Sequence, residues 1–343
     1  QKPVSSGPFI LKRRVKNQFI ELVRNKNYFG KKPNLERVIF KIVPDKTSLL
    51  LQLKNGEIDM MAGVNPDHVA DLQSSNPDIA LYRVSGRTYY YIGYNEKNPL
   101  FKEKQVRRAL TMAIDRNGLI EATLQGYGKP CTGPVPPIVS WAYNDSIPPI
   151  PFNVAGAKNL LANAGWKDHD GDGWLDKDGR DFKFVLRTNA GNQIKADLAV
   201  IVQDQLKKIG VKVDIRSLEW TAFMDKLRRK EFDAYIGGWS TSFNVDPTPI
   251  FHSTATNLFN YIGYNNPQVD QLIEAGREEM NRQKAAKIWK TMQDEIYRDQ
   301  PYTFLFWLDK IVAVNSKFKN VTPIPLSMFY GLENWYEAKI STD

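Results

Sequence analysis

The stretch Gly238–Pro247 combines an indole ring with several polar side chains. Trp239 offers a flat apolar face, and hydroxyl, amide and carboxylate groups follow at alternate positions: Ser240, Ser242, Asn244 and Asp246. The stretch directly continues Phe232–Trp239, an apolar segment typical of a buried strand. Ligands of open α/β sheets bind beyond the carboxyl ends of strands, in pockets that mix apolar walls with a few polar groups. The sequence therefore predicts a small-ligand pocket here, and the alternative is an ordinary turn that stops at Pro247.

Two further turns stand at the ends of predicted strands. Trp220 follows the strand Val211–Ser217, and it either lines a pocket or packs in the core. The turn after the strand Phe182–Thr188 precedes a helix, so its backbone amides are available to an anionic or hydroxyl group, which makes Asn189 and Asn192 candidates. Four more candidates lie in a crossover segment and in a long loop, where packing is the competing explanation: Tyr91, Asn95, Trp141 and Tyr143.

An acidic turn has carboxylates at the spacing of calcium ligands. Aspartates stand at relative positions 1, 3 and 5 and a glycine at position 6, as at the start of an EF-hand loop: Asp168, Asp170, Asp172 and Gly173. Asp176 adds a fourth carboxylate, but Gly179 stands at position 12 in place of the bidentate Glu. The two interpretations are a calcium site and a glycine-stabilised acidic turn without metal. No other cofactor is expected.

The sequence carries no recognisable catalytic motif. Its three histidines stand neither in an HExxH pattern nor in a Ser-His-Asp context: His68, His169 and His252. No phosphate-binding loop or GxGxxG follows a predicted strand. Nothing singles out a pair of carboxylates of the kind that a glycosidase uses. We therefore expect a binding protein, and an enzyme that acts on saccharides is the alternative class.

The stretch Tyr89–Arg116 organises the elements that must position these turns. Aromatic and β-branched residues predict a strand over Tyr89–Tyr94, and Asn98 before Pro99 ends it. A helix follows, because apolar residues recur at i, i+3, i+4 and i+7: Val106, Ala109, Leu110 and Ala113. Its basic residues are expected on the other faces: Lys104, Arg107, Arg108 and Arg116.

Strands alternate with helices along the chain, which favours an α/β architecture. The apolar patterns predict a hairpin of Phe9–Arg14 and Phe19–Arg24, a helix over Thr47–Lys54 capped by Asp45, and a strand over Glu57–Met61. They also predict a helix over Lys195–Ile209, helices over Pro267–Asn281 and Gln283–Asp299, and a strand over Tyr302–Leu308. Pro130–Pro151 is expected to be a long loop, and long ordered loops are often functional.

Composition sets broad limits on function. A chain of 343 residues with 42% hydrophobic residues has room for two domains with real cores. The net charge of +9 is spread over helices and loops and comes with no nucleic-acid-binding motif, so we expect a solvated basic surface and no nucleic-acid partner. No apolar run approaches the roughly 20 residues of a membrane span. The single cysteine, Cys131, excludes an internal disulfide.

Several motifs together resemble one family, the extracytoplasmic solute-binding proteins of peptide/nickel/oligosaccharide ABC transporters. They follow in order as GPF and RNKNY within Ser5–Tyr28, LKNGEID over Leu53–Asp59, YIGYN with VRRALTMAIDR over Tyr91–Arg116, and W with DP over Trp239–Pro247. The resemblance covers essentially the whole chain. Its order makes it far more specific than any one motif.

The resemblance implies a two-lobed α/β fold of the type II periplasmic-binding-protein kind, with mixed sheets and a hinge. The expected lobes are residues 1–92 with 309–343, and residues 93–308. The first residues resemble an internal segment of the family, so the resemblance also implies that the first lobe is incomplete at its N-terminal side.

The function implied by the resemblance is the capture of a solute between the lobes and its delivery to an ABC permease, at the periplasmic or extracellular face of the cytoplasmic membrane. The solute is expected to be an oligopeptide or dipeptide, with an oligosaccharide as the alternative. Contact with the membrane is expected only through the permease or through a lipid anchor outside this chain. Peptide binders of the family usually carry an aspartate near Ser242 for the ligand's ammonium group, so either Asp246 takes this role or the ligand has no such group.

Overall fold

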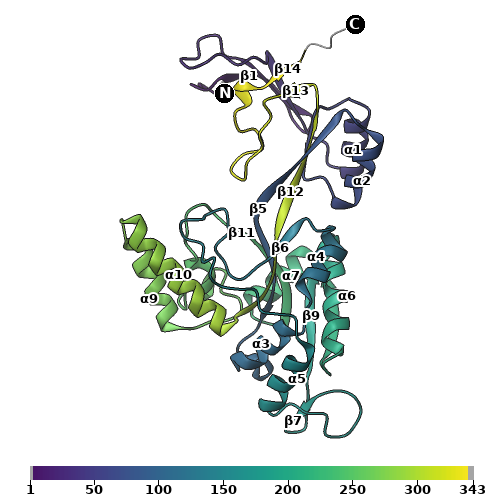
Figure 1. The fold of residues 1–343 in the computed structure, drawn as a ribbon, viewed down its shortest axis with the longest axis vertical. Coiled ribbons are helices and arrows are strands. Elements are labelled where there is room, and N and C mark those ends of the chain that lie inside the picture. The colour runs from purple at the N-terminus through teal and green to yellow at the C-terminus, as the bar shows by residue number, and fades with distance from the viewer. Residues whose placement is uncertain (1–2, 339–343) are drawn as a thin grey trace. The chain divides into compact units, whose positions relative to one another are not determined.

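The computed structural model describes residues 3–338 of an α/β protein that divides into two compact units (Figure 1). Unit 1 comprises Gln1–Gly86 with Asp309–Asp343, and unit 2 comprises Arg87–Leu308. The chain passes between the units in strands β5 (Ile79–Tyr94) and β12 (Tyr302–Asn315), which are neighbours in one sheet. Both strands are longer than their apolar patterns predicted. The division after Gly86 lies inside β5 and precedes the boundary expected at residue 92, whereas the second boundary, before Asp309, lies where it was expected.

Unit 1 contains a three-stranded antiparallel sheet and a small α/β segment. The sheet comprises the expected hairpin and a third strand: β1 (Phe9–Val15), β2 (Phe19–Arg24) and β3 (Arg37–Lys41). The segment continues with α1 (Lys46–Lys54), β4 (Met60–Ala62), η1 (Pro66–His68) and α2 (Val69–Ser75), and β4 pairs with β12. The unit also holds β13 (Phe318–Lys319), η4 (Leu332–Asn334) and β14 (Tyr336–Glu337).

The strand expected over Glu57–Met61 begins only at Met60. The backbone N–H groups of Glu57 and Ile58 both donate to the carbonyl of Gln52, at 2.8 and 3.3 Å. At the other end of α1, the Asp45 side chain accepts a hydrogen bond from the backbone N–H of Ser48. Asp45 is therefore the N-cap that the sequence predicted. The prediction for Glu57–Asp59 was wrong because the end of a helix needs donors for its last carbonyls, and these residues supply them.

Unit 2 is built on a mixed sheet. Its strand order is β10 (Lys212–Leu218), β9 (Lys183–Asn189), β11 (Ala234–Ser240), β5 and β12, with β6 (Gly128–Pro130) also on β12. Strand β9 pairs in parallel with both β10 and β11, and β11 pairs antiparallel with β5. The carboxyl ends of β9, β10 and β11 therefore meet at one edge of the sheet, and the candidate turns follow these three ends.

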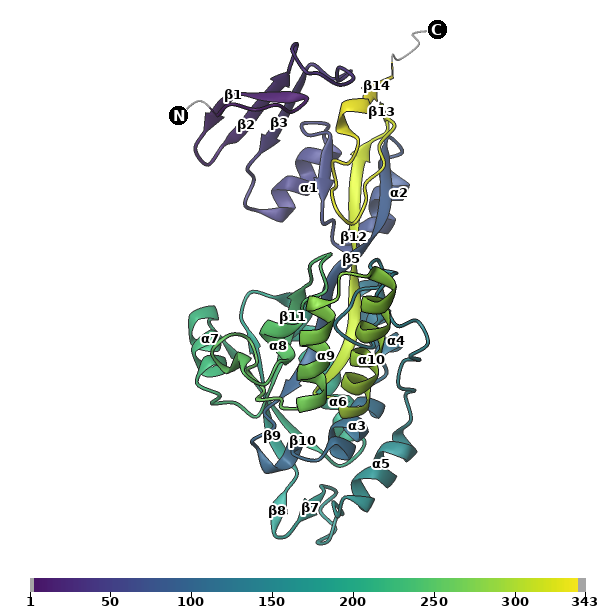
Figure 2. The same ribbon diagram turned by 90° about the vertical axis from the view of Figure 1, so that its left-hand side faces the viewer.

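Helices cover both faces of this sheet. The helices of unit 2 are α3 (Lys104–Met112), α4 (Arg116–Leu124), α5 (Val154–Asn163), α6 (Gln193–Lys207), α7 (Trp220–Arg228), α8 (Thr248–Phe251), α9 (Pro267–Glu278) and α10 (Arg282–Asp299). Shorter elements are η2 (Pro99–Phe101), η3 (Ala255–Asn257) and the hairpin of β7 (Asp176–Lys177) with β8 (Arg180–Asp181). Figure 2 shows α9 and α10 side by side. Within residues 3–338 no helix combines the length and apolar character needed to cross a membrane.

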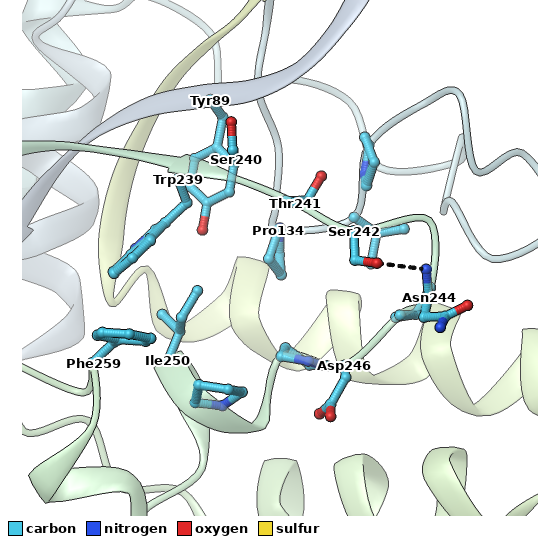
Figure 3. A pocket seen from close by; sticks show the side chains of 15 residues that line it. Tyr89, Pro134, Trp239, Ser240, Thr241, Ser242, Asn244, Asp246, Ile250 and Phe259 are labelled. Carbon is cyan, nitrogen blue, oxygen red and sulfur yellow. Dashed lines mark hydrogen bonds between the residues drawn. The ribbon is translucent and has the colours of Figure 1, made fainter. Parts of the chain in front are cut away.

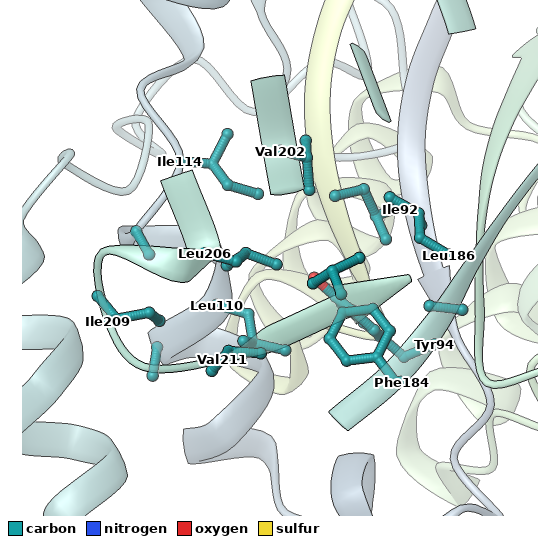
Figure 4. Close-up of a cluster of buried hydrophobic side chains, with 14 of the residues drawn as sticks. Ile92, Tyr94, Leu110, Ile114, Phe184, Leu186, Val202, Leu206, Ile209 and Val211 are labelled. Carbon is teal, nitrogen blue, oxygen red and sulfur yellow. The ribbon is translucent and has the colours of Figure 1, made fainter. Parts of the chain in front are cut away.

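Alternation along β5 divides the core of unit 2 in two. Tyr90, Ile92 and Tyr94 belong to a cluster with residues of α3, α4 and α6 (Figure 4). Tyr89 and Tyr91 belong to a second cluster with residues of α7, α9 and α10. Successive strand residues point to opposite faces, so one aromatic run supplies both halves of the core.

Two arginines that the sequence placed away from the apolar stripe, Arg107 and Arg116, are buried. Arg107 donates to the backbone carbonyls of Phe101 at 2.7 Å and Gln300 at 2.9 Å. Arg116 donates to the carbonyls of Cys131 and Ile150. Helical periodicity assigned them to faces away from the apolar stripe without indicating that these faces are buried. A guanidinium carries five donors, so it can satisfy several buried backbone carbonyls at once.

Candidate functional site

A hollow of about 370 Å³ lies in unit 2 beyond the carboxyl end of β11 (Figure 3). We call it the Trp239 hollow. Three stretches and one strand residue line it: Tyr89, Pro134–Pro136, Trp239–Ser242 with Asn244–Pro247, and Pro249, Ile250 and Phe259. All five residues that the sequence singled out in Gly238–Pro247 are among them: Trp239, Ser240, Ser242, Asn244 and Asp246. The structure thus brings this predicted set together around one space.

Aromatic side chains fix the position of Trp239. Its ring is parallel to that of Tyr91, with 6.5 Å between centroids, and lies 5.1 Å from the ring of Phe259. In Figure 3 the indole extends from β11 toward Phe259 and Ile250. A flat apolar surface held in this way contacts a ligand with little loss of side-chain entropy on binding.

The loop after β11 is anchored to the start of unit 2 by Arg87. Both the backbone N–H and the hydroxyl of Thr241 donate to the carbonyl of Arg87, at 2.9 and 3.0 Å. The Arg87 guanidinium donates to the carbonyl of Thr241 and lies 4.9 Å from the ring centroid of Phe243. The next pair, Thr88 and Ser240, is joined by their hydroxyls at 2.6 Å. No local pattern in the sequence marks Arg87, because its partners are about 150 residues away along the chain.

Asp246 lines the hollow, but its carboxylate already has partners. Its Oδ1 accepts from the backbone N–H of Thr248 at 3.1 Å and from the hydroxyl of the same residue. Its Oδ2 lies 3.6 Å from Nε of Arg277. A carboxylate that already accepts two hydrogen bonds and faces a guanidinium attracts an ammonium group less than a free one does. Of the two alternatives left open at Ser242, this geometry favours a site that does not depend on a ligand ammonium.

Trp220 and the turn at Asn189 lie elsewhere on the same sheet edge. Trp220 is 54% exposed, which contradicts core packing, yet it does not line the Trp239 hollow. Asn192 caps α6 by accepting from the N–H of Lys195 at 3.1 Å, and Asn189 accepts from Nζ of Lys195 at 2.6 Å. Burial lowers the pKa of Lys195 to about 8. These residues form a polar group around a buried lysine that no sequence motif marks.

For Tyr91 and Asn95, two of the four candidates from the crossover and the long loop, the structure favours the packing explanation. Tyr91 is 1% exposed, stacks on Tyr302 at 3.9 Å between centroids and bonds the Tyr235 hydroxyl at 3.0 Å. The Asn95 amide donates to the carbonyls of Lys230 and Phe232, at 3.1 and 2.9 Å. Both side chains are structural, because their polar atoms are used within the fold.

Trp141 and Tyr143 do not line the Trp239 hollow either. Both are half-buried and pack against the cluster of Tyr89 and Tyr91. Trp141 borders a second, more open hollow beside α10, where the Arg282 guanidinium lies 5.1 Å from its ring centroid. The long loop does contribute to the Trp239 hollow, but through Pro134–Pro136. The Pro and Ser content of the loop pointed to the right segment without identifying the residues.

The acidic turn brings three of its four predicted carboxylates together. Asp168, Asp170 and Asp172 are exposed and present oxygens within 4.8 Å of one another. Each of the three carboxylates accepts backbone N–H bonds of its own turn, including Gly171 to Asp168 at 2.8 Å. Asp176 is not part of this group, because it accepts from the N–H and Nδ1 of His169, at 2.9 and 2.8 Å.

Comparisons with known proteins agree with the motif order. Residues 1–260 match the family described as bacterial extracellular solute-binding proteins, family 5 middle. The chain is 38% identical to the oligopeptide-binding protein AppA of Bacillus subtilis, over 99% of this chain and 63% of that protein. It is 30% identical to heme-binding protein A of Haemophilus influenzae, over 96% of this chain and 60% of that protein.

The fold agrees as well. The structure of Bacillus subtilis AppA in complex with a nonapeptide superposes with a TM-score of 0.77, over 97% of this chain and 66% of that one. The predicted periplasmic-binding-protein fold with mixed sheets is thereby confirmed. The chain spans less than two thirds of the length of the curated relatives described here, 63% and 60%.

Proposed function

Because this chain belongs to the family 5 bacterial extracellular solute-binding proteins, we propose that it captures an oligopeptide and delivers it to the permease of an ABC transporter. It would act outside the cytoplasmic membrane, at the periplasmic or extracellular face, and by binding alone, without covalent chemistry. We favour a peptide over an oligosaccharide, because the relative with 38% identity is named for oligopeptide binding. The heme-binding relative is less similar, at 30% identity.

The observation that carries this proposal is the Trp239 hollow. It follows the carboxyl end of β11, where α/β sheets bind ligands, and it mixes aromatic walls with hydroxyl and amide groups. Its volume of about 370 Å³ is at the lower end of the roughly 300–1,000 Å³ of small-ligand sites, so it suits part of an oligopeptide rather than the whole.

Mass spectrometry of the native purified protein tests the proposal. We expect peptides of several residues to be released on denaturation. A synthetic nonapeptide mixture, randomised at every position, serves as the probe if none are carried through. Recovery of heme or a saccharide instead of peptides, or cleavage of added peptides over time, would contradict the proposal.

A substitution at the hollow tests where the peptide binds. Trp239→Ala is expected to weaken binding of the retained nonapeptides by more than about 1 kcal/mol, as the loss of an aromatic anchor does. The matched control is Trp220→Ala, which removes an exposed tryptophan outside the hollow. Equal affinities of wild type and Trp239→Ala would place the peptide elsewhere.

A further inference from the structure

The Tyr89 hydroxyl is buried beside the Trp239 hollow without a hydrogen-bond partner among residues 3–338. The side chain is fully buried, and its ring packs against those of Trp307 at 5.0 Å and of Phe304 at 5.7 Å between centroids. Figure 3 shows the ring descending from β5 with its hydroxyl directed between Trp239 and Pro134, toward Ile250. An unpaired buried hydroxyl is costly, so a group held in this way is suited to a partner that arrives with the ligand.

Other tyrosines of β5 are satisfied within the fold. The Tyr94 hydroxyl bonds that of Thr303 at 2.8 Å, and the Tyr91 hydroxyl bonds that of Tyr235 at 3.0 Å. The ring of Tyr89 packs against the rings of Tyr91 and Trp307, and these contacts hold its hydroxyl beside the hollow. Burial in this aromatic group raises the pKa of Tyr89 well above its usual value, so the hydroxyl keeps its proton and is a donor at neutral pH.

The walls of the hollow are mostly apolar and carry little charge. Proline, valine, isoleucine and aromatic side chains supply most of the lining. Asp246 is the one ionisable carboxylate among the lining residues described, and Thr248 and Arg277 already contact it. Placing a charged ligand group here would remove its hydration without a free opposite charge.

We propose that the Trp239 hollow is a subsite for an uncharged, apolar side chain of the bound peptide, and that Tyr89 Oη donates a hydrogen bond to a carbonyl oxygen of that peptide. This inference rests on the proposed function and specifies the ligand class of the same site. Apolar contact with Trp239, Phe259 and Ile250 supplies affinity. The tyrosine hydroxyl, which has no partner within residues 3–338, adds to the affinity of the complex without adding to the stability of the free fold.

The first experiment compares two isosteric substitutions. Tyr89→Phe removes the unpaired hydroxyl and keeps the ring, whereas Tyr94→Phe removes a hydroxyl that is bonded inside the core. The probe is the nonapeptide most enriched by the wild type from the randomised mixture, measured by calorimetry. We expect Tyr89→Phe to bind it about tenfold more weakly at an unchanged or higher melting temperature, and Tyr94→Phe to melt earlier with unchanged affinity. Equal affinity of Tyr89→Phe and wild type, or an equal loss in Tyr94→Phe, would overturn the role of Tyr89.

The second experiment reads the side-chain preference of the subsite. Sequencing of the retained nonapeptides is expected to show apolar residues enriched, and charged residues depleted, at one or more positions. Ile250→Glu places a carboxylate in the hollow and is expected to shift that position toward Lys and Arg. Retained peptides with no apolar preference, or an Ile250→Glu profile identical to wild type, would overturn the subsite and leave the proposed function standing. Failure of the wild type to retain any peptide would instead overturn the proposed function itself, and this inference with it.

Discussion

Residues that directly follow β5 are held in place by buried polar contacts, and the partly buried carboxyl of Glu96 makes stability depend on pH. Its Oε1 lies 3.8 Å from Nη2 of Arg107, yet it has no hydrogen-bond partner within residues 3–338. Burial raises the pKa of Glu96 to about 7; the Arg107 charge opposes this shift and the Asp299 charge adds to it. The folded protein therefore binds a proton between about pH 4.5 and 7 that the unfolded chain releases.

Glu96→Gln is expected to change how stability depends on pH. In the wild type this group contributes stability that is fully present below about pH 4.5 and is lost as pH rises through about 7, because the folded pKa is the higher one. The variant keeps a neutral side chain throughout, so its free energy of unfolding falls less over this window. At pH 8 it exceeds that of the wild type by about 1–3 kcal/mol. Chemical denaturation from pH 4 to 8 measures this. Glu278→Gln, at an exposed glutamate of α9, is the control, and parallel curves for Glu96→Gln and wild type would contradict the expectation.

At the scale of elements, the loop after β11 depends on its contacts with β5. Arg87 contributes a carbonyl, a guanidinium donor and a stacked face to Thr241 and Phe243. We predict that Arg87→Ala speeds amide hydrogen exchange over residues 240–247 and weakens binding of the retained nonapeptide by about 1 kcal/mol, since a loosened loop must be ordered on binding. Exchange mass spectrometry with calorimetry measures both effects.

The control for this loop is Arg14→Ala, which removes an exposed arginine of β1. It is expected to change neither exchange over residues 240–247 nor affinity. Protection of the loop that survives in Arg87→Ala would mean that the backbone pairing of β11 with β5 suffices to position the loop.

The acidic turn is the second element with a testable property. Its three clustered carboxylates already accept backbone N–H groups, and all three are exposed. If they bind calcium, mass action predicts a higher melting temperature with millimolar calcium and a lower one with chelator. Asp170→Asn is expected to remove that response. An unchanged melting curve in calcium would leave the glycine-stabilised turn as the explanation.

At the scale of the whole molecule, β5 and β12 are the strands that both units share. A solute that binds only the folded protein stabilises it by mass action, by about 2.7 kcal/mol when its concentration is 100 times Kd. We therefore predict that the retained nonapeptide raises the melting temperature by several degrees. Maltotriose, added at the same concentration, is the control solute. An increase with maltotriose and none with the peptide would favour the saccharide alternative.

Local sequence determined the elements whose residues interact over short distances. The aromatic and β-branched residues of Tyr89–Tyr94, the apolar stripe of α3 and the Asp45 cap of α1 each predicted an element that the structure contains. The motif order also predicted the family. The run Gly238–Pro247 was identified as a site candidate because a polar turn after a buried strand is itself a local pattern. Its residues do meet around the Trp239 hollow.

Only the tertiary structure decided which side chains meet across long sequence separations. Tyr89 and Tyr91 are alike in sequence, yet the Tyr91 hydroxyl faces Tyr235 and the Tyr89 hydroxyl faces the hollow. Arg107 lies on the polar face of its helix, yet its guanidinium donates hydrogen bonds to the backbone carbonyls of Asp299 and Gln300. Periodicity specifies the face on which a side chain lies, whereas its partner depends on how distant elements pack. Because the contacts of Tyr89, Arg87 and Arg107 depend on this packing, the sequence alone does not predict them.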